Sequence, residues 1–231
     1  MGLKEPGLRG SLRNVSVGIG APPDSVVSQY DPREESTGSL SSITDQLGFA
    51  ELTGSCSVID DGINSNRSFR FDGTEFVDHT TTYSSNQKYA VVYALQQQEP
   101  PDSNAFYCDG GNDLEYSLQD NDDTEYRMRR RDDGSHLVDS SGVTVDQEPH
   151  VFVLEAFETG RVRVERDGTD IIDDEDGEIN DLTGLTIGSR FDGNTPIEAD
   201  LGIIGVLVDQ SSDDVDQYRD FIANEYGITV N

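Results

Sequence analysis

The sequence predicts an all-β fold of two packed antiparallel sheets, with an extended N-terminal arm and one C-terminal helix. Short segments rich in Val, Ile, Phe and Tyr recur along the chain, separated by clusters of Gly, Asp, Asn and Ser. Turn residues at this spacing favour a sandwich over alternating strands and helices. A chain of 231 residues can bury one sizeable core, so we expect a single main domain at residues 24–231.

The predicted strands run from residue 68 to residue 209. Residues 161–171 (RVRVERDGTDI) alternate as a half-exposed strand should, and Asp167-Gly168 supplies the turn. Residues 88–95, 150–156 and 201–209 are apolar on both faces, so we place them in the middle of a sheet. The full set of predicted strand segments is 68–73, 74–79, 88–95, 104–111, 114–120, 124–134, 150–156, 161–171, 185–193 and 200–209.

One helix is predicted, over about residues 212–226. Ser211 or Ser212 can cap its N-terminus, acidic residues follow in the first turn, and Gly227 suits a left-handed residue after the last turn. An apolar stripe indicates that the helix docks on the sandwich; it consists of Val215, Tyr218, Phe221, Ile222 and Tyr226.

The charge balance is extreme. The chain carries 46 acidic and 16 basic side chains, for a formal net charge of -30. Repulsion between these charges weakens the compact state in dilute buffer, because the Debye length is about 8 Å at 0.15 M salt and shrinks to about 3 Å at 1 M. The composition resembles that of proteins from haloarchaea and their viruses. Nucleic acid is excluded as an expected partner, both by charge sign and by the salt sensitivity of phosphate contacts.

Residues 1–23 differ from the rest of the chain. They hold Lys4, Arg9 and Arg13 against Glu5 alone, so this arm is basic while the body is strongly acidic. We expect the arm to dock on another subunit through its basic and apolar residues, although a disordered tail has a similar composition. The proposed anchoring residues are Lys4, Leu8, Arg9, Leu12 and Arg13.

Cysteines and apolar runs are sparse. Cys56 and Cys108 form either one disulfide or two free thiols, and the sequence leaves both alternatives open. Neither a membrane span nor a signal peptide is expected, since no apolar run approaches about 18 residues and no charged leader precedes one.

Several segments in order resemble the concanavalin A-like lectin/glucanase jelly roll in its laminin G-like form. They are INSNRSFRFDGTEFV, YAVVYAL, HVFVLEAF, RVRVERDGTDI, LTGLTIGSRFDG, ADLGIIGVLVD and the final helix ending in NEYGI. The resemblance runs from about residue 24 to residue 230 and implies a two-sheet jelly roll. Modules of this family are common in surface and tail proteins of tailed viruses and in secreted glycan-active proteins.

The resemblance also implies glycan binding on aromatic faces, although this chain has no Trp. Tyr83, Tyr107, Tyr116 and Tyr126 are candidate substitutes. Arg127, Arg129 and Arg131 share one face of a predicted strand, where guanidinium groups suit carboxylates or sulfates of an acidic glycan. Ion pairing of these arginines with Glu115 or Glu125 is the alternative, and we favour it. Should the glycan interpretation hold instead, the candidate residues are Tyr116, Tyr126, Arg127, Arg129 and Arg131.

No catalytic or cofactor site is expected. Glucanases of this fold carry an E-x-D-x-x-E run, whereas Glu155 and Glu158 lack the central acid. The acidic segment 167–181 resembles a calcium loop, but Ile172 occupies the first ligand position of the best alignment, so it is no EF-hand. A surface cation site there stays an alternative to a solvated acidic loop. The three histidines lack zinc spacing.

The tetrapeptide RFDG occurs at 70–73 and again at 190–193. The residues on either side of the two copies do not align, so a duplication is disfavoured. Both copies fit a strand end in which Phe enters the core, Arg lies on the opposite face and Asp-Gly begins a turn.

These inferences lead to one functional expectation with two alternatives. We expect a non-enzymatic structural protein on the surface of a haloarchaeal tailed virus, in a capsid decoration, turret or tail. It would form a homo-oligomer, attach to other virion proteins through the arm, and bind host-surface glycans. The alternatives are a glycan-cleaving enzyme of the same fold and a free archaeal lectin-like protein.

Overall fold

A computed structural model of the chain describes residues 22–83, 88–98, 105–107, 117–121, 125–132, 135–174, 182, 184–189 and 197–231. Within 105–107, 117–121, 129–132 and 135–140 it describes the backbone alone. Almost all of the predicted arm, Cys108, Tyr116 and the second RFDG copy lie outside the described residues.

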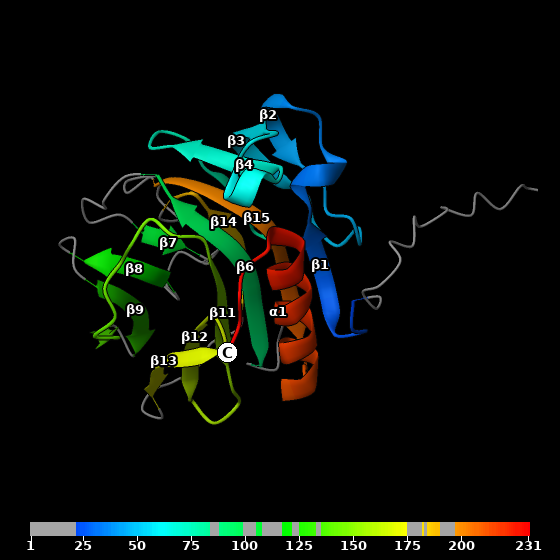
Figure 1. Ribbon diagram of the computed structural model, residues 1–231. Coiled ribbons are helices and arrows are strands. Elements are labelled where there is room, and N and C mark those ends of the chain that lie inside the picture. Colours follow the sequence, from blue (N-terminus) through cyan, green and yellow to red (C-terminus); the bar gives the residue numbers. More distant parts are fainter. Residues whose placement is uncertain are drawn as a thin grey trace, which may run out of the picture.

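The described strands form two antiparallel sheets, which confirms the predicted fold class (Figure 1). The larger sheet runs β13-β12-β11-β6-β15-β4-β3-β5-β14, with β1 paired to β15 and β2 to β3, and the smaller runs β10-β9-β8-β7. The strands of the larger sheet are β1 (Val26–Tyr30), β2 (Gly38–Ile43), β3 (Leu52–Ile59), β4 (Ser68–Asp72), β5 (Val77–His79), β6 (Tyr89–Gln97), β11 (His150–Ala156), β12 (Val162–Arg166), β13 (Thr169–Asp174), β14 (Leu185–Ile187) and β15 (Glu198–Val208). Those of the smaller sheet are β7 (Ala105–Tyr107), β8 (Ser117–Asn121), β9 (Glu125–Asp132) and β10 (Ser135–Ser140).

The three segments predicted to be buried on both faces are β11, β6 and β15, and they are neighbours in the larger sheet. Their side chains alternate between two cores. In β6, Val91 and Tyr93 belong to the core inside the sandwich, whereas Ala90 and Val92 belong to the core beneath the helix. The first core also includes Tyr126 of β9 and residues of β3, β5 and β14, so both sheets close around it.

The helix α1 (Ser212–Tyr226) confirms the prediction at both ends. Ser211 accepts a hydrogen bond from the Asp214 backbone N–H, and the Asp214 side chain accepts one from the Ser211 backbone N–H. Gly227 is left-handed, with φ of 64°. The buried stripe of α1 lies on the larger sheet, and Figure 1 shows the helix alongside β1, β6 and β15.

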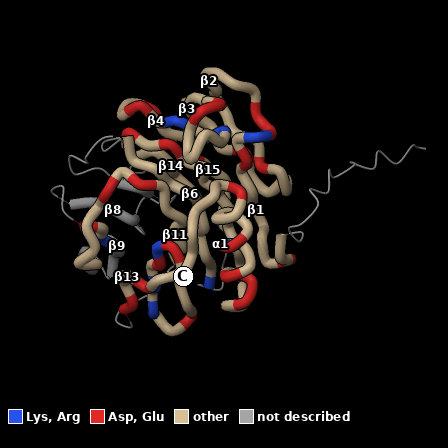
Figure 2. The backbone as a smooth tube through the Cα atoms, in the orientation of Figure 1, with Lys and Arg blue, Asp and Glu red and all other residues tan. Residues whose placement is uncertain are grey.

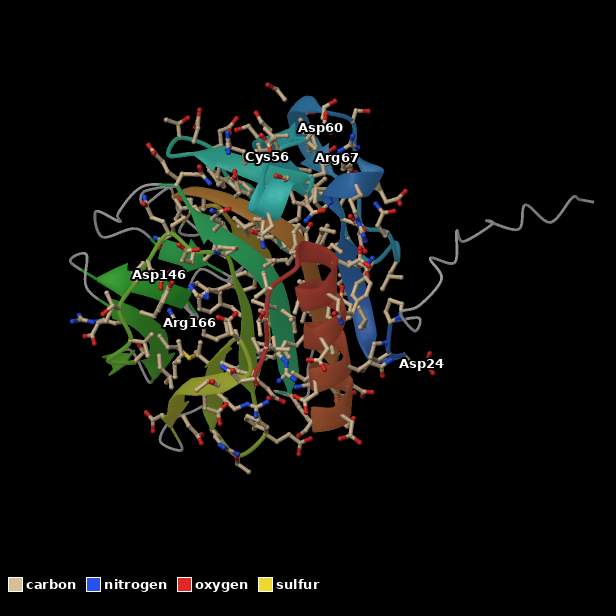
Figure 3. The ribbon with its side chains drawn as sticks, viewed as in Figure 1. Asp24, Cys56, Asp60, Arg67, Asp146 and Arg166 are labelled. Carbon is tan, nitrogen blue, oxygen red and sulfur yellow. The ribbon has the colours of Figure 1, made fainter. Side chains whose placement is uncertain are left out.

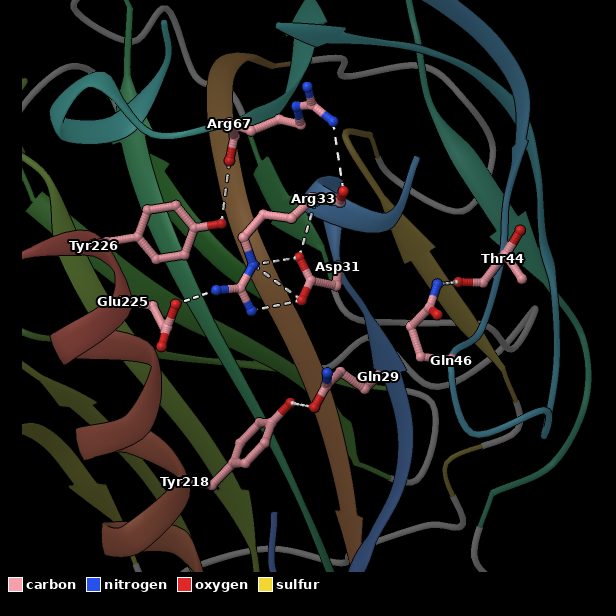
Figure 4. A network of polar contacts seen from close by, with 9 residues as sticks. All are labelled: Gln29, Asp31, Arg33, Thr44, Gln46, Arg67, Tyr218, Glu225 and Tyr226. Carbon is pink, nitrogen blue, oxygen red and sulfur yellow. Dashed lines mark hydrogen bonds and ion pairs between the residues drawn. The ribbon is translucent and has the colours of Figure 1, made fainter. Parts of the chain in front are cut away.

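Polar contacts join α1 to the N-terminal part of the domain (Figure 4). Tyr218 donates its hydroxyl hydrogen to Gln29 Oε1 over 3.0 Å, and Tyr226 donates to the Arg67 backbone carbonyl over 3.2 Å. Arg33, in the short 3-10 helix η1 (Pro32–Glu34), bridges the buried Asp31 and Glu225 of the helix. A second 3-10 helix, η2 (Ile63–Ser65), lies close to β6 and β15.

Two glycines of β15 provide room for the helix tyrosines. A Cβ on Gly202 would lie 2.4 Å from the Tyr226 ring, and one on Gly205 would lie 2.0 Å from the Tyr218 ring. Positions three apart in a regular strand face opposite sides, but a bulge between Leu201 and Ile204 adds one residue, so both glycines face the helix. The gapped LGIIGVLVD pattern therefore reflects contact between backbone and rings.

The first RFDG copy has the predicted geometry. Phe71 is buried in the sandwich core, Arg70 lies on the other face and pairs with Asp200 at 2.7 Å, and Gly73 has φ of 82°. The predicted turn at Asp167-Gly168 is confirmed as well, because both residues have positive φ and join β12 to β13.

The sequence did not predict β1, β2, β3 or β10. The strands β2 and β3 are rich in Ser, Thr and Gly and expose much of one face, so their apolar alternation is weak. Each is nonetheless paired, because pairing satisfies backbone groups whatever the side chains. The strand β1 pairs with the distant β15, whereas β2 pairs with β3 and β10 with β9, in each case a neighbour in the sequence.

The described surface is strongly acidic. Figure 2 shows acidic positions in many loops and strand ends, with few basic ones. Cys56 is a free thiol buried in the sandwich core, and burial raises its pKa to about 12. None of the helices in the described part of the chain has the length and apolar character needed to cross a membrane.

Candidate functional site

Two large apolar side chains stand exposed on one loop. Leu47 and Phe49, each 39% exposed, lie in residues 44–51 between β2 and β3. Within the described part of the chain, Leu47 and Phe49 are the large hydrophobic side chains that are exposed. We call Leu47 and Phe49 the apolar platform.

A buried carboxylate holds the loop in shape. Asp45 is 6% exposed, and each of its oxygens accepts several hydrogen bonds. The donors are the Ser28 hydroxyl (2.8 Å) and the backbone N–H groups of Gln29 (3.0 Å), Leu47 (2.9 Å), Phe49 (2.8 Å) and Ala50 (3.0 Å). Charge-assisted bonds of this kind are stronger than neutral ones, so the loop is fixed before any ligand arrives.

The Phe49 ring rests on a second aromatic ring. It stacks on Tyr83 with centroids 4.7 Å apart and planes 15° apart. Tyr83 is buried, so the exposed ring has a rigid support beneath it. One face of Phe49 is thus committed to Tyr83, and the exposed remainder of the ring is presented to solvent.

A chain of hydrogen bonds fixes Tyr83 in turn. Thr81 N–H donates to His79 Nδ1 over 3.1 Å, so the other ring nitrogen, Nε2, carries the proton and donates to the Tyr83 hydroxyl over 2.7 Å. Tyr83 donates to Tyr30 over 2.8 Å, and Tyr30 donates to the Ala50 carbonyl over 2.9 Å. The chain ends on the same loop that carries Phe49.

Burial keeps these groups neutral. It lowers the pKa of His79 to about 4 and raises the pKa of Tyr30 to about 12. Burial also raises the pKa of Tyr83. The neutral His79 and the two tyrosines thus hold the Tyr83 ring in place through a continuous chain of hydrogen bonds.

The two sequence segments that carry the platform and its supporting rings contain acids and no cation. No Lys or Arg occurs at residues 34–66 or 71–87. Glu51 is exposed at the end of the platform loop, and the buried Asp45 lies in the same loop. Exposed neutral hydroxyls follow His79, at Thr80, Thr81 and Thr82.

The structure corrects the expectation for Tyr126. Its ring is 1% exposed and lies in the sandwich core, 5.1 Å from Phe152 between ring centroids. Arg166 covers it at 5.7 Å. A ring in this position offers no face to a sugar, because its place on β9 points it inward.

Arg127 occupies a partly buried position on β9 and pairs with Glu125 at 3.3 Å, one of the two acids expected to neutralise it. Arg129 and Arg131 occupy alternate positions of the same strand. Their side chains, Tyr116 and the anchoring residues Lys4, Leu8, Arg9, Leu12 and Arg13 lie outside what the structure describes, and so does the Tyr107 side chain.

A second polar cluster lies near Tyr126 and has a structural explanation. His150 contacts Asp167 at 2.5 Å and Asp146 at 2.7 Å, and Asp146 also pairs with Arg166 at 3.3 Å (Figure 3). Burial lowers the pKa of His150, but the two carboxylates outweigh burial and raise it above its ordinary value. Both ring nitrogens are committed, so His150 ties together the ends of β11 and β12.

Of the two acids weighed for catalysis, Glu155 is buried and Glu158 is exposed. Glu155 is 1% exposed, pairs with Arg163 at 2.7 Å and accepts from Gln210 over 3.3 Å. In the acidic segment, Asp173 pairs with Arg161 at 2.6 Å. Within the described residues, no three His, Cys, Asp or Glu side chains gather in a way that would hold a metal ion.

Sequence reasoning missed Leu47, Phe49 and Asp45. One signal was present: an apolar pair within DQLGFA, a short polar segment with Gly and no strand alternation. Apolar residues in such a loop either bury themselves or form a surface patch, and here they form the patch. The role of Asp45 depends on five donors and has no sequence signature.

No protein-family model matches the sequence, and no curated protein matches it either. Solved structures do match in fold. Domain 4 of AbnA, an extracellular GH43 arabinanase from Geobacillus stearothermophilus, has a TM-score of 0.67 at 11% identity, over 85% of this chain and 98% of that domain. Its structure was determined with arabinotriose.

Two further structures resemble parts of longer chains. The Trypanosoma rangeli sialidase, determined with sialic acid, has a TM-score of 0.62 at 12% identity, over 90% of this chain and 34% of the sialidase. The receptor-binding domain of a botulinum neurotoxin C/D mosaic has a TM-score of 0.63 at 10% identity, over 86% of this chain and 51% of that one. At these identities the likeness establishes the β-sandwich fold alone.

Proposed function

We propose that this protein is a non-enzymatic carbohydrate-binding β-sandwich whose ligand stacks on the apolar platform. The observation that carries the proposal is an exposed aromatic ring, Phe49, fixed on a second ring and on a loop that Asp45 holds rigid. Sugar rings present apolar C–H faces that pack on aromatic rings, and a rigid loop reduces the entropy lost on binding.

The structural neighbours support this choice of ligand. One was determined with arabinotriose, another with sialic acid, and a third is a receptor-binding domain. At such low sequence identity, the roles of individual residues in these neighbours cannot be transferred to this chain. The platform residues are therefore proposed from their own exposure and packing.

Carbohydrate cleavage is a weaker proposal. Glycoside hydrolysis needs two carboxyl groups facing the scissile bond, about 5 to 9.5 Å apart. Glu155 is buried against Arg163, and the hydrogen bonds of Asp45 are taken up by the loop. We therefore propose binding without turnover.

Removal of the Phe49 ring tests whether the apolar platform binds the glycan. Phe49→Ala is expected to abolish glycan binding while the domain stays folded; the thermal unfolding temperature should fall modestly, because the stacking on Tyr83 is lost but the ring is partly exposed and no hydrogen bond depends on it. Binding is measured on a glycan array in molar salt and then by calorimetry. Phe49→Trp is the matched control; its larger face should retain or strengthen binding. Undiminished binding by Phe49→Ala would contradict the proposal.

We further propose that this module is displayed on the virion of a haloarchaeal tailed virus, where it attaches the virion to host-surface glycans. The charge of -30 and the basic arm at residues 1–23 support the proposal. Molar salt screens the charged body, while the opposite charge and apolar residues of the arm suit docking on other acidic virion subunits.

Deletion of residues 1–23 tests the anchoring. The truncated protein should fold, with unchanged circular dichroism and glycan binding, and should be absent from particles purified in molar salt. Mass spectrometry of the particles measures its incorporation against the full chain. Normal incorporation of the truncated protein would refute the anchoring role.

A further inference from the structure

We infer that the apolar platform selects neutral sugars and rejects anionic ones, such as sialylated, uronate or sulfated glycans. The inference rests on the carbohydrate-binding function proposed above and concerns the same loop. It follows from how the loop uses its own hydrogen-bond donors and from the charges around it.

A loop with consecutive inward N–H groups is a ready anion site. In this loop the protein supplies the anion itself, because Asp45 accepts from Leu47, Phe49 and Ala50. The two intervening N–H groups are also used: Gln46 donates to the Gln29 carbonyl over 2.8 Å, and Gly48 donates to the Asp45 carbonyl over 3.1 Å. Every backbone donor from Gln46 to Ala50 is therefore occupied within the protein.

The charged side chains that flank the loop in the sequence offer no replacement. No cationic residue occurs at 34–66 or 71–87, and the arginines that border these segments are paired with carboxylates: Arg33 with Asp31 and Glu225, Arg67 with Asp60, and Arg70 with Asp200. A carboxylate or sulfate brought to Phe49 would lose hydration, gain no backbone donor from residues 46–50, and meet a loop that carries both Asp45 and Glu51.

The exposed polar groups near the platform suit hydroxyls. Thr80, Thr81 and Thr82 follow His79, whose ring contacts Tyr83 beneath Phe49. Hydroxyl side chains both donate and accept, which matches the neutral hydroxyls of a hexose. An uncharged sugar with an apolar face satisfies the ring and these hydroxyls without an uncompensated charge.

The test compares neutral sugars with anionic derivatives built on the same core. The full-length protein is titrated with lactose, with 3′-sialyllactose and with lactose 3′-sulfate, and with the corresponding glucose and mannose oligosaccharides and their uronates, at 0.5 M and 3 M salt. We expect the neutral members to bind and their anionic counterparts to bind at least about tenfold more weakly at both salt concentrations. Loss of the neutral binding in Phe49→Ala assigns the selectivity to the platform.

The outcomes separate the inference from the proposed function. Equal or tighter binding of the anionic members, abolished by Phe49→Ala, would overturn the selectivity while leaving carbohydrate binding in place. Binding of no sugar in either series would overturn both. A gain-of-function variant gives independent support: Glu51→Lys places one cation beside the loop and should raise the affinity for the anionic members relative to the neutral ones.

Discussion

Replacing Asp45 with asparagine is expected to lower the free energy of unfolding by about 2–4 kcal/mol. Asn keeps the size of Asp but turns one acceptor oxygen into an NH2 donor. That group would face N–H donors already aimed at Oδ2, from Phe49 at 2.8 Å and Ala50 at 3.0 Å. Buried donors left without acceptors cost about 1–3 kcal/mol each, and the loop can relax to recover part of that.

Urea unfolding at constant molar salt measures this change. Glu51→Gln is the matched control, since it removes the same charge from the same loop at an exposed carboxylate. Hydrogen exchange supplies a local measurement: the amides of Leu47, Phe49 and Ala50 should exchange faster in Asp45→Asn alone. If the two variants are equally stable and exchange alike, Asp45 contributes only its charge.

The same substitution connects stability to binding. Phe49 stacks on Tyr83 only while the loop keeps its shape, so Asp45→Asn should also weaken sugar binding, whereas Phe49→Ala should remove binding at a smaller cost in stability. Two variants of one loop would thus separate the scaffold of the site from its contact surface.

Local signals in the sequence were sufficient for the central strands and the helix. The apolar runs in β6, β11 and β15 and the Ser211 and Gly227 caps each depend on a few neighbouring residues, and the structure confirms them. The turn at Asp167 and Gly168, where both residues have positive φ, was also predictable because it depends on these two neighbouring residues alone.

The candidate site depends on contacts between distant residues. Tyr30 and Tyr83 are 53 positions apart, and Ser28 reaches Asp45 across 17. Neither the pairing of β2 with β3 nor the burial of Tyr126 follows from composition, so the aromatic residues of the sequence could not be sorted into exposed and buried ones. Phe49 differs from Tyr126 only in the tertiary packing around it.

The second large expected loss of stability comes from a substitution in the contact between α1 and β15. Gly205→Ala is expected to lower the free energy of unfolding by about 1–3 kcal/mol, because overpacking a rigid core forces side chains and backbone to shift. The new Cβ would lie 2.0 Å from the Tyr218 ring, which is buried and held by its bond to Gln29. Gln29 also donates its backbone N–H to Asp45, so a displaced ring would disturb the platform loop from behind.

A double-mutant cycle with Tyr218→Leu identifies the clash as the cause. Leucine is shorter than tyrosine, so Gly205→Ala should cost little in that background, giving a coupling of about 1 kcal/mol or more by urea unfolding. Gly202→Ala, whose Cβ would meet Tyr226 at 2.4 Å, should behave alike when paired with Tyr226→Leu. Additive costs would instead mean that the glycines are needed for the backbone of the bulge, because then the penalty would persist after the ring is gone.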